Sequence, residues 1–137
     1  MATRSRIAME MEDKTVVSIY CHWDGYPSHN GQTLIDHYNT PEKVKALIAL
    51  GSLSSLQERL EPSGPHSFSN PEEGVTVAYH RDRGEEFSQQ THKSVLAFFK
   101  GDIEEFGYLF TQEGEWLVAA AYGSSKMPMR VIDALKE

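Results

Sequence analysis

The sequence of 137 residues contains a single cysteine, Cys21, so no disulfide can form within the chain. We therefore expect the reducing environment of a cytoplasm. Only 13 lysine and arginine residues stand against 20 aspartate and glutamate residues, and the formal net charge is −7. That balance argues against a protein whose main work is to bind polymeric nucleic acid or an anionic lipid surface. No apolar run approaches the roughly 18 residues that a membrane span needs.

The sequence also lacks the short motifs that mark common catalytic and metal-binding sites. The opening MATRSRIAMEMED does not read as a signal peptide, because charged residues interrupt every apolar stretch. There is no CxxC, HExxH, G-x-S-x-G, phosphate-binding loop or dinucleotide-binding motif. The six histidines are scattered singly along the chain. We therefore expect no metal site, no cofactor and no membrane association.

Apolar periodicity predicts one α+β domain over residues 1–137. The expected sheet is mostly antiparallel and consists of two hairpins plus a central strand, with three to four helices packed on it. Thr40 and Pro41 are typical of a helix start, and Gly51 and Gly101 are typical of helix ends. The pattern predicts strands over 4–11, 15–22, 74–79, 106–111 and 115–122, helices over 31–38, 41–50, 91–101 and 128–135, and a further helical turn within 53–60.

The most unusual segment lies where the second strand ends and the first helix begins. It places His22, Trp23, Asp24 and Tyr26 in one loop, a frequent location for functional residues on a rigid scaffold. One interpretation is a turn whose two aromatics wedge the hairpin against the helix. The other is direct contact of the same side chains with a ligand or partner.

A second polar cluster is expected at the end of the strand over 74–79. Here His80, Arg81 and Arg83 alternate with acidic residues, which is typical of a solvated edge. The functional interpretation is that an arginine fork binds a phosphate or carboxylate. If this strand lies beside the first hairpin, His80 and Asp82 come close to His22 and Asp24.

A catalytic pair of Cys21 and His22 is disfavoured, because neighbouring residues on a strand point to opposite faces. Cys21 shares a face with Val17 and Ile19. We therefore expect a buried, inert thiol.

These motifs also carry a resemblance. Through the two polar clusters and the further residues named at the end of this paragraph, the chain resembles a group of small proteins found in bacteriophages and in bacterial genomes. The resemblance covers roughly the first two thirds of its length. The likeness assigns no catalytic residue. It implies an accessory protein that acts in the cytoplasm of a host cell, a setting in which small proteins often block defence by binding a protein complex or sequestering a nucleotide. The matching residues are Thr3-Arg4-Ser5, His22-Trp23-Asp24-Gly25-Tyr26-Pro27, Gly31, Val44, Leu50-Gly51, His66-Ser67-Phe68 and Tyr79-His80-Arg81-Asp82-Arg83-Gly84.

Two classes of function stay open at this point. The first is a binding protein that interferes with a host defence factor and that can also form a homo-oligomer. It would use either an acidic surface around Asp102, Glu104 and Glu105 to bind a host protein, or a pocket of aromatic and arginine side chains to hold a small anionic, nucleotide-like ligand.

The second class is a small hydrolase or nucleic-acid-processing enzyme. His22 or His80 would then act as the general base, and Asp24 or Asp82 would orient the imidazole.

Overall fold

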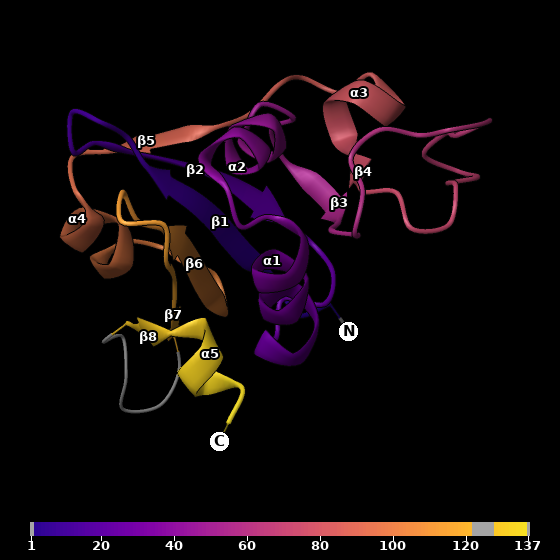
Figure 1. Ribbon diagram of the computed structural model, residues 1–137. Coiled ribbons are helices and arrows are strands. Elements are labelled where there is room, and N and C mark those ends of the chain that lie inside the picture. The colour runs from indigo at the N-terminus through magenta and orange to yellow at the C-terminus, as the bar shows by residue number, and fades with distance from the viewer. Residues whose placement is uncertain (1, 122–127, 137) are drawn as a thin grey trace.

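The computed structural model describes residues 2–121 and 128–136 (Figure 1). The fold is α+β with a mixed, mostly antiparallel sheet, as the periodicity predicts. Within the described residues the sheet has eight strands, more than the two hairpins and one strand expected, and the helices are also more numerous. In this part of the chain, no helix has the length and apolar character required to cross a membrane.

Two hairpins form the middle of the sheet. The first joins β1 (Ser5–Glu10) to β2 (Val16–Cys21), and the second joins β6 (Phe106–Phe110) to β7 (Trp116–Ala120). Both hairpins confirm the prediction. They meet through a parallel pairing of β1 with β6, so β1 lies in the interior of the sheet.

The outer edge of β2 is shared by two short strands that the sequence did not predict. Cys21 pairs with β3 (Leu53–Ser55), and the other end of β2 pairs with β5 (Gln90–His92). The prediction of a helical turn within 53–60 is therefore wrong for residues 53–55, whose backbone groups pair with the free edge of β2. The helix expected from Thr91 begins later, as α4 (Val95–Lys100), because Ser94 caps it.

The third predicted strand, over 74–79, is also shorter and lies elsewhere. Only β4 (Val77–Ala78) remains, and it stands at the edge of the sheet beside β3. The chain turns helical at once into α3 (Tyr79–Arg83). The side chain of Asp82 favours this turn, because its Oδ2 accepts the backbone N–H of Ala78, four residues earlier, at 2.8 Å.

The remaining helices follow the prediction with shifted boundaries. A π-helical turn over Pro27–Gly31 leads into α1, and Thr40 caps α2. At the C-terminal end β8 pairs with β7, so the helix predicted over 128–135 begins only at Val131. Residue 122, the expected end of the last hairpin strand, lies outside the described residues. The bounds are α1 (Gln32–His37), α2 (Pro41–Ile48), β8 (Met129–Arg130) and α5 (Val131–Ala134).

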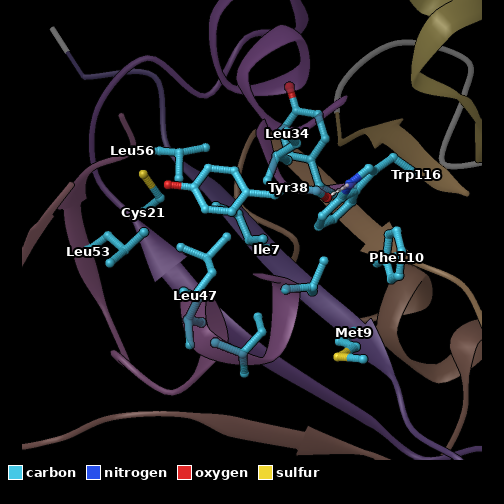
Figure 2. Close-up of a cluster of buried hydrophobic side chains, with 14 of the residues drawn as sticks. Ile7, Met9, Cys21, Leu34, Tyr38, Leu47, Leu53, Leu56, Phe110 and Trp116 are labelled. Carbon is cyan, nitrogen blue, oxygen red and sulfur yellow. Dashed lines mark hydrogen bonds between the residues drawn. The ribbon is translucent and has the colours of Figure 1, made fainter. Parts of the chain in front are cut away.

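Apolar side chains are buried on both faces of the sheet. On one face Ile7 and Tyr108 pack with residues of α1, α2 and α5, and the indole N–H of Trp116 donates to the carbonyl of Tyr38 at 2.7 Å (Figure 2). On the other face Ala8 and Leu109 pack with α4. Alternate side chains of β1 and β6 therefore enter two hydrophobic cores, one on each face of the sheet, and neither face is open to solvent along these strands.

Replacing Gly107 by Ala tests the packing of the second core. A Cβ at this position in β6 would lie 2.7 Å from the Cβ of Ile103, a side chain that is fully buried. We expect a loss of about 1–3 kcal/mol of unfolding free energy by urea denaturation, because overpacking displaces both groups. Gly64→Ala, in an exposed loop where the nearest atom is 3.6 Å away, is the control. Equal stability of the two variants would contradict this packing.

Candidate functional site

The unusual segment after β2 forms a turn whose backbone is hydrogen-bonded to the strand β3 and to Thr3. His22 and Trp23 extend the strand, because their N–H groups donate to the carbonyls of Leu53 and Ser54 at 3.0 Å each. Asp24 then takes a left-handed conformation with φ +59°, which aspartate tolerates better than most residues. We call His22, Trp23, Asp24 and Tyr26 the aromatic turn.

The buried side chain of Asn30 supports the aromatic turn through hydrogen bonds. Its side chain is fully buried, and its amide nitrogen donates to Ser5 Oγ at 3.3 Å, to the carbonyl of Trp23 at 3.4 Å and to Cys21 Sγ at 3.5 Å. Its amide oxygen pairs with the ring of His29 at 2.9 Å. One buried side chain therefore connects β1, the end of β2 and the π-helical turn.

Gly25 is needed because the backbone passes close to β1. Its N–H donates to the carbonyl of Thr3 at 2.8 Å. A Cβ here would lie 2.9 Å from both Ser5 Cβ and that carbonyl oxygen. Tyr108 also donates its hydroxyl to the carbonyl of Gly25. Hydrogen bonds to Thr3 and to Tyr108 of β6 therefore hold the backbone of the turn against the sheet.

The aromatic turn displays two large side chains to solvent. Trp23 is 43% exposed and Tyr26 is 39% exposed. The ring of His22 meets the indole of Trp23 edge-on, with centroids 4.8 Å apart. Tyr26 donates its hydroxyl to Asp24 Oδ1 at 3.2 Å, and the negative charge of Asp24 raises the pKa of Tyr26. The sequence prediction that these residues lie together is confirmed by these contacts.

The contacts of His22 do not assemble a catalytic pair with Asp24. Its ring nitrogen Nδ1 lies 2.8 Å from the hydroxyl of Tyr20, which is its hydrogen-bond partner. Asp24 instead accepts from Tyr26. Cys21 is buried, which confirms the prediction of a buried thiol, and burial raises the pKa of this thiol to about 12.

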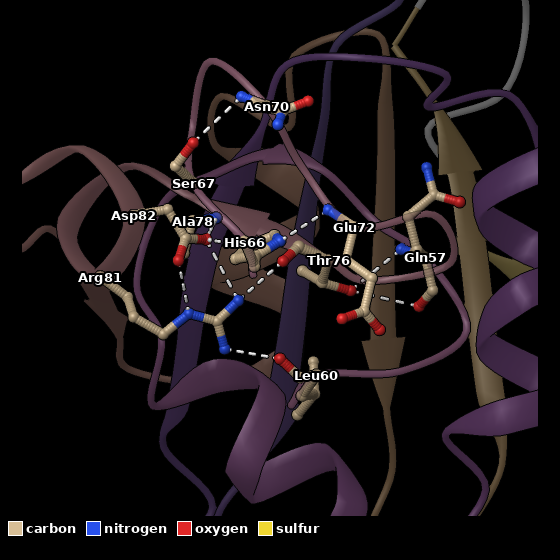
Figure 3. A network of polar contacts seen from close by, with 10 residues as sticks. All are labelled: Gln57, Leu60, His66, Ser67, Asn70, Glu72, Thr76, Ala78, Arg81 and Asp82. Carbon is tan, nitrogen blue, oxygen red and sulfur yellow. Dashed lines mark hydrogen bonds and ion pairs between the residues drawn. The ribbon is translucent and has the colours of Figure 1, made fainter. Parts of the chain in front are cut away.

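The second predicted cluster divides between the interior and the surface. Arg81 points inward, and all three of its guanidinium nitrogens donate to protein oxygens, namely Asp82 at 2.9 Å, the carbonyl of Leu60 at 2.6 Å and the carbonyl of Thr76 at 2.8 Å (Figure 3). Arg83 is half exposed and pairs with Glu85 at 3.1 Å. His80 donates from Nδ1 to the carbonyl of the same glutamate at 2.8 Å. Of these three residues, His80 and Arg83 are exposed to solvent.

The inward arginine belongs to a buried network that sequence reasoning missed. Nδ1 of His66 accepts the backbone N–H of Glu72 at 3.0 Å, so the ring proton is on Nε2. That nitrogen lies 3.2 Å from Asp82 Oδ2 and makes no hydrogen bond within the described residues. The side chains of His66 and Asp82 are 3% and 5% exposed. The network thus ties the 61–74 loop to β4 and α3.

No local pattern could have revealed this network. His66 stands in a segment rich in proline and serine, where no periodicity indicates burial. Burial opposes the ionisation of Asp82, but hydrogen bonds from Arg81 and Ala78, together with the adjacent His66 ring, outweigh it and lower the pKa of Asp82. Because His66 and Asp82 are buried, they form a structural clasp rather than an accessible acid–base pair.

The acidic residues 102, 104 and 105 lie in the loop between α4 and β6. Asp102 Oδ1 accepts the N–H of Glu104 at 2.9 Å, and Glu105 Oε2 accepts the N–H of Arg4 at 2.7 Å. Two of the three carboxylates thus shape the loop, and Glu104 adopts φ +61°. The charges of Asp102 and Glu104 also favour the cationic form of the buried Arg6, whose pKa burial lowers.

The two predicted clusters are separated by β3. The end of β2 pairs with β3, and β3 pairs with β4, from which α3 continues. No hydrogen bond or ion pair joins His22 or Asp24 to His80 or Asp82 in the described part of the chain. Residues 2–121 and 128–136 also contain no group of three or more His, Cys, Asp or Glu side chains placed to hold a metal ion.

Comparisons of the chain with protein-family models, with curated proteins and with solved structures give no match.

Proposed function

We propose that this chain is a phage-type accessory protein that binds a host protein through the aromatic turn and so interferes with a host defence factor. The observation that carries the proposal is the exposure of Trp23 and Tyr26, at 43% and 39%, on a backbone held by buried contacts. Large aromatics on a rigid support are typical of binding hot spots, because little conformational entropy is lost when they are covered.

A protein partner is favoured over a small anionic ligand by the arrangement of the positive charges. The pocket expected from the sequence would use arginine nitrogens facing the aromatic rings to hold the phosphate. Arg81 uses its guanidinium inside the protein, and β3 lies between the aromatic turn and α3. The setting of infection and host defence rests on the resemblance to the phage-type proteins. The hydrolase alternative has no specific contact in its favour.

Photo-crosslinking identifies the partner in the first step of the test. A photoreactive phenylalanine analogue replaces Tyr26 in one version of the protein and Phe87 in another. The two side chains are similarly exposed, at 39% and 44%, which makes Phe87 the matched control. We expect one host protein to be crosslinked by the analogue at position 26 and not by the analogue at position 87.

Titration of the purified host protein then measures the contribution of the indole. Trp23→Ala is expected to weaken the complex about 30-fold, the effect of a hot spot of about 2 kcal/mol. Phe87→Ala should stay within about twofold, and both variants should keep the melting temperature because exposed positions contribute little to stability. Equal weakening by both variants would overturn the proposal. Native mass spectrometry that finds a retained small anion, lost on Trp23→Ala, would replace protein binding by ligand sequestration.

A further inference from the structure

A groove opens at the opposite end of the first hairpin from the aromatic turn. Its larger hollow, about 720 Å³, lies between the β1–β2 turn, the start of α2 and the end of β6. A smaller hollow of about 210 Å³ is lined by the same Met9, Met11, Val17 and Lys45 and continues along α2. We call the two together the hairpin-end groove. The larger hollow is lined by Met9, Glu10, Met11, Glu12, Asp13, Thr15, Val17, Pro41, Lys45, Phe110, Thr111 and Gln112.

The floor of the hairpin-end groove is apolar. Met9 and Phe110 are buried and belong to the first core, whereas Met11 and Val17 are half-buried at its margin. This core therefore extends to the surface at the end of the hairpin. Methionine side chains are unbranched and polarisable, so they adapt to apolar groups of varied shape.

The rim of the groove carries mostly negative charge. Three carboxylates, Glu10, Glu12 and Asp13, line the larger hollow against the single cation of Lys45. Glu10 Oε1 is held in place by the N–H of Gln112 at 3.1 Å. Asp13 accepts the N–H of Thr15 at 3.0 Å, and hydrogen bonds from Thr15 lower its pKa, so its carboxylate is ionised at neutral pH. Hydrogen bonds within the β1–β2 turn and from the β6–β7 turn thus hold the carboxylates of Asp13 and Glu10 at the rim.

We propose that the hairpin-end groove docks a basic partner segment. An apolar side chain of the segment enters the methionine-lined hollow, and flanking lysine or arginine residues meet Glu10, Glu12 and Asp13. The charge of the rim selects this occupant over a second copy of the same chain, whose net charge of −7 would add repulsion. The surface is separate from the aromatic turn, so its test does not depend on the proposed function.

Fluorescence anisotropy with two model peptides tests the groove on the intact protein. One is an amphipathic helix of leucine and lysine, and the other has the same leucine pattern with glutamate in place of lysine. We expect micromolar binding of the Leu/Lys peptide that weakens as salt is added, and no binding of the Leu/Glu peptide. Glu12→Lys and Met11→Gln should each weaken the Leu/Lys complex about tenfold.

Matched controls distinguish docking in the groove from attraction to an acidic protein in general. Glu73→Lys makes the same charge change at an exposed position of the 61–74 loop, no residue of which lines either hollow, and Trp23→Ala alters the other end of the hairpin. Both should leave peptide affinity within about twofold. The proposal is overturned if Glu73→Lys weakens binding as much as Glu12→Lys, if the Leu/Glu peptide binds equally well, or if Met11→Gln binds like the native protein. Glu12 is exposed in a turn, so its variant reports on docking even if Met11→Gln is unstable.

Discussion

Replacing Asp82 by Asn is expected to lower the free energy of unfolding by about 3 kcal/mol at neutral pH. The carboxylate accepts from Ala78 and Arg81 and lies 3.2 Å from His66 Nε2, so every neighbour of its two oxygens is a donor. The asparagine amide nitrogen would instead turn a donor toward one of these donors. The cost is large because Ala78 and His66 are buried and cannot exchange the lost contact for water.

The difference in stability between the native protein and Asp82→Asn depends on pH, and the sign of this dependence follows from the pKa of Asp82. The pKa of Asp82 in the folded protein lies below its ordinary value. The stability that the carboxylate contributes is therefore present above the unfolded pKa of about 3.9 and is lost as pH falls through the folded pKa. Urea denaturation should show the native protein and Asp82→Asn converging below about pH 4.

Glu85→Gln is the control for the Asp82 prediction. Glu85 also pairs with an arginine, Arg83, but both side chains are about half exposed. Its removal should change stability by less than about 0.5 kcal/mol, as for other exposed ion pairs. If Asp82→Asn were no more destabilising than Glu85→Gln, the clasp between the 61–74 loop and α3 would not contribute to the fold.

Asn30→Asp is expected to cost about 3 kcal/mol at neutral pH, although it changes only an amide to a carboxylate. The nitrogen that donates to the carbonyl of Trp23 becomes an oxygen facing another oxygen in a fully buried position. His29 offers a ring nitrogen to the other oxygen, so the penalty falls on the side toward Trp23. The variant should also weaken binding through the aromatic turn, because the backbone of Trp23 loses its support.

Burial should raise the pKa of this introduced aspartate above its unfolded value, which sets the sign of the pH effect. Between the two pKa values the unfolded chain is ionised and the folded chain is protonated, so stability falls as pH rises from about 4 and then levels. Asn30→Ala, which adds no charge, should lose about 1–3 kcal/mol with no such slope. Parallel pH profiles of the two variants would contradict the buried placement of Asn30.

Much of the fold could be predicted where the determinants are local. The alternation in 5–10 and 16–21 predicts the first hairpin, and Thr40 followed by Pro41 predicts the start of α2. The short strands β3 and β5 could not be predicted, because three residues are too few for a periodic pattern and their partner is an edge of β2. Nor does the sequence pattern indicate that Arg6 is buried, which follows from α4 covering the face of β1 on which Arg6 lies.

The candidate site divides in the same way. The sequence by itself determined the composition of the aromatic turn and its place between a strand and a helix, because the alternation of the strand ends there and Pro27 suits a helix start. It also determined the burial of Cys21, through the alternation along β2. Only the tertiary structure decided that position 25 requires glycine, because the backbone there passes close to β1. It alone also decided that Arg81 is a structural residue and that Asn30 supports Trp23. The partners of Arg81 and Asn30 include residues as distant along the chain as Leu60 and Ser5, which meet them only when the sheet assembles.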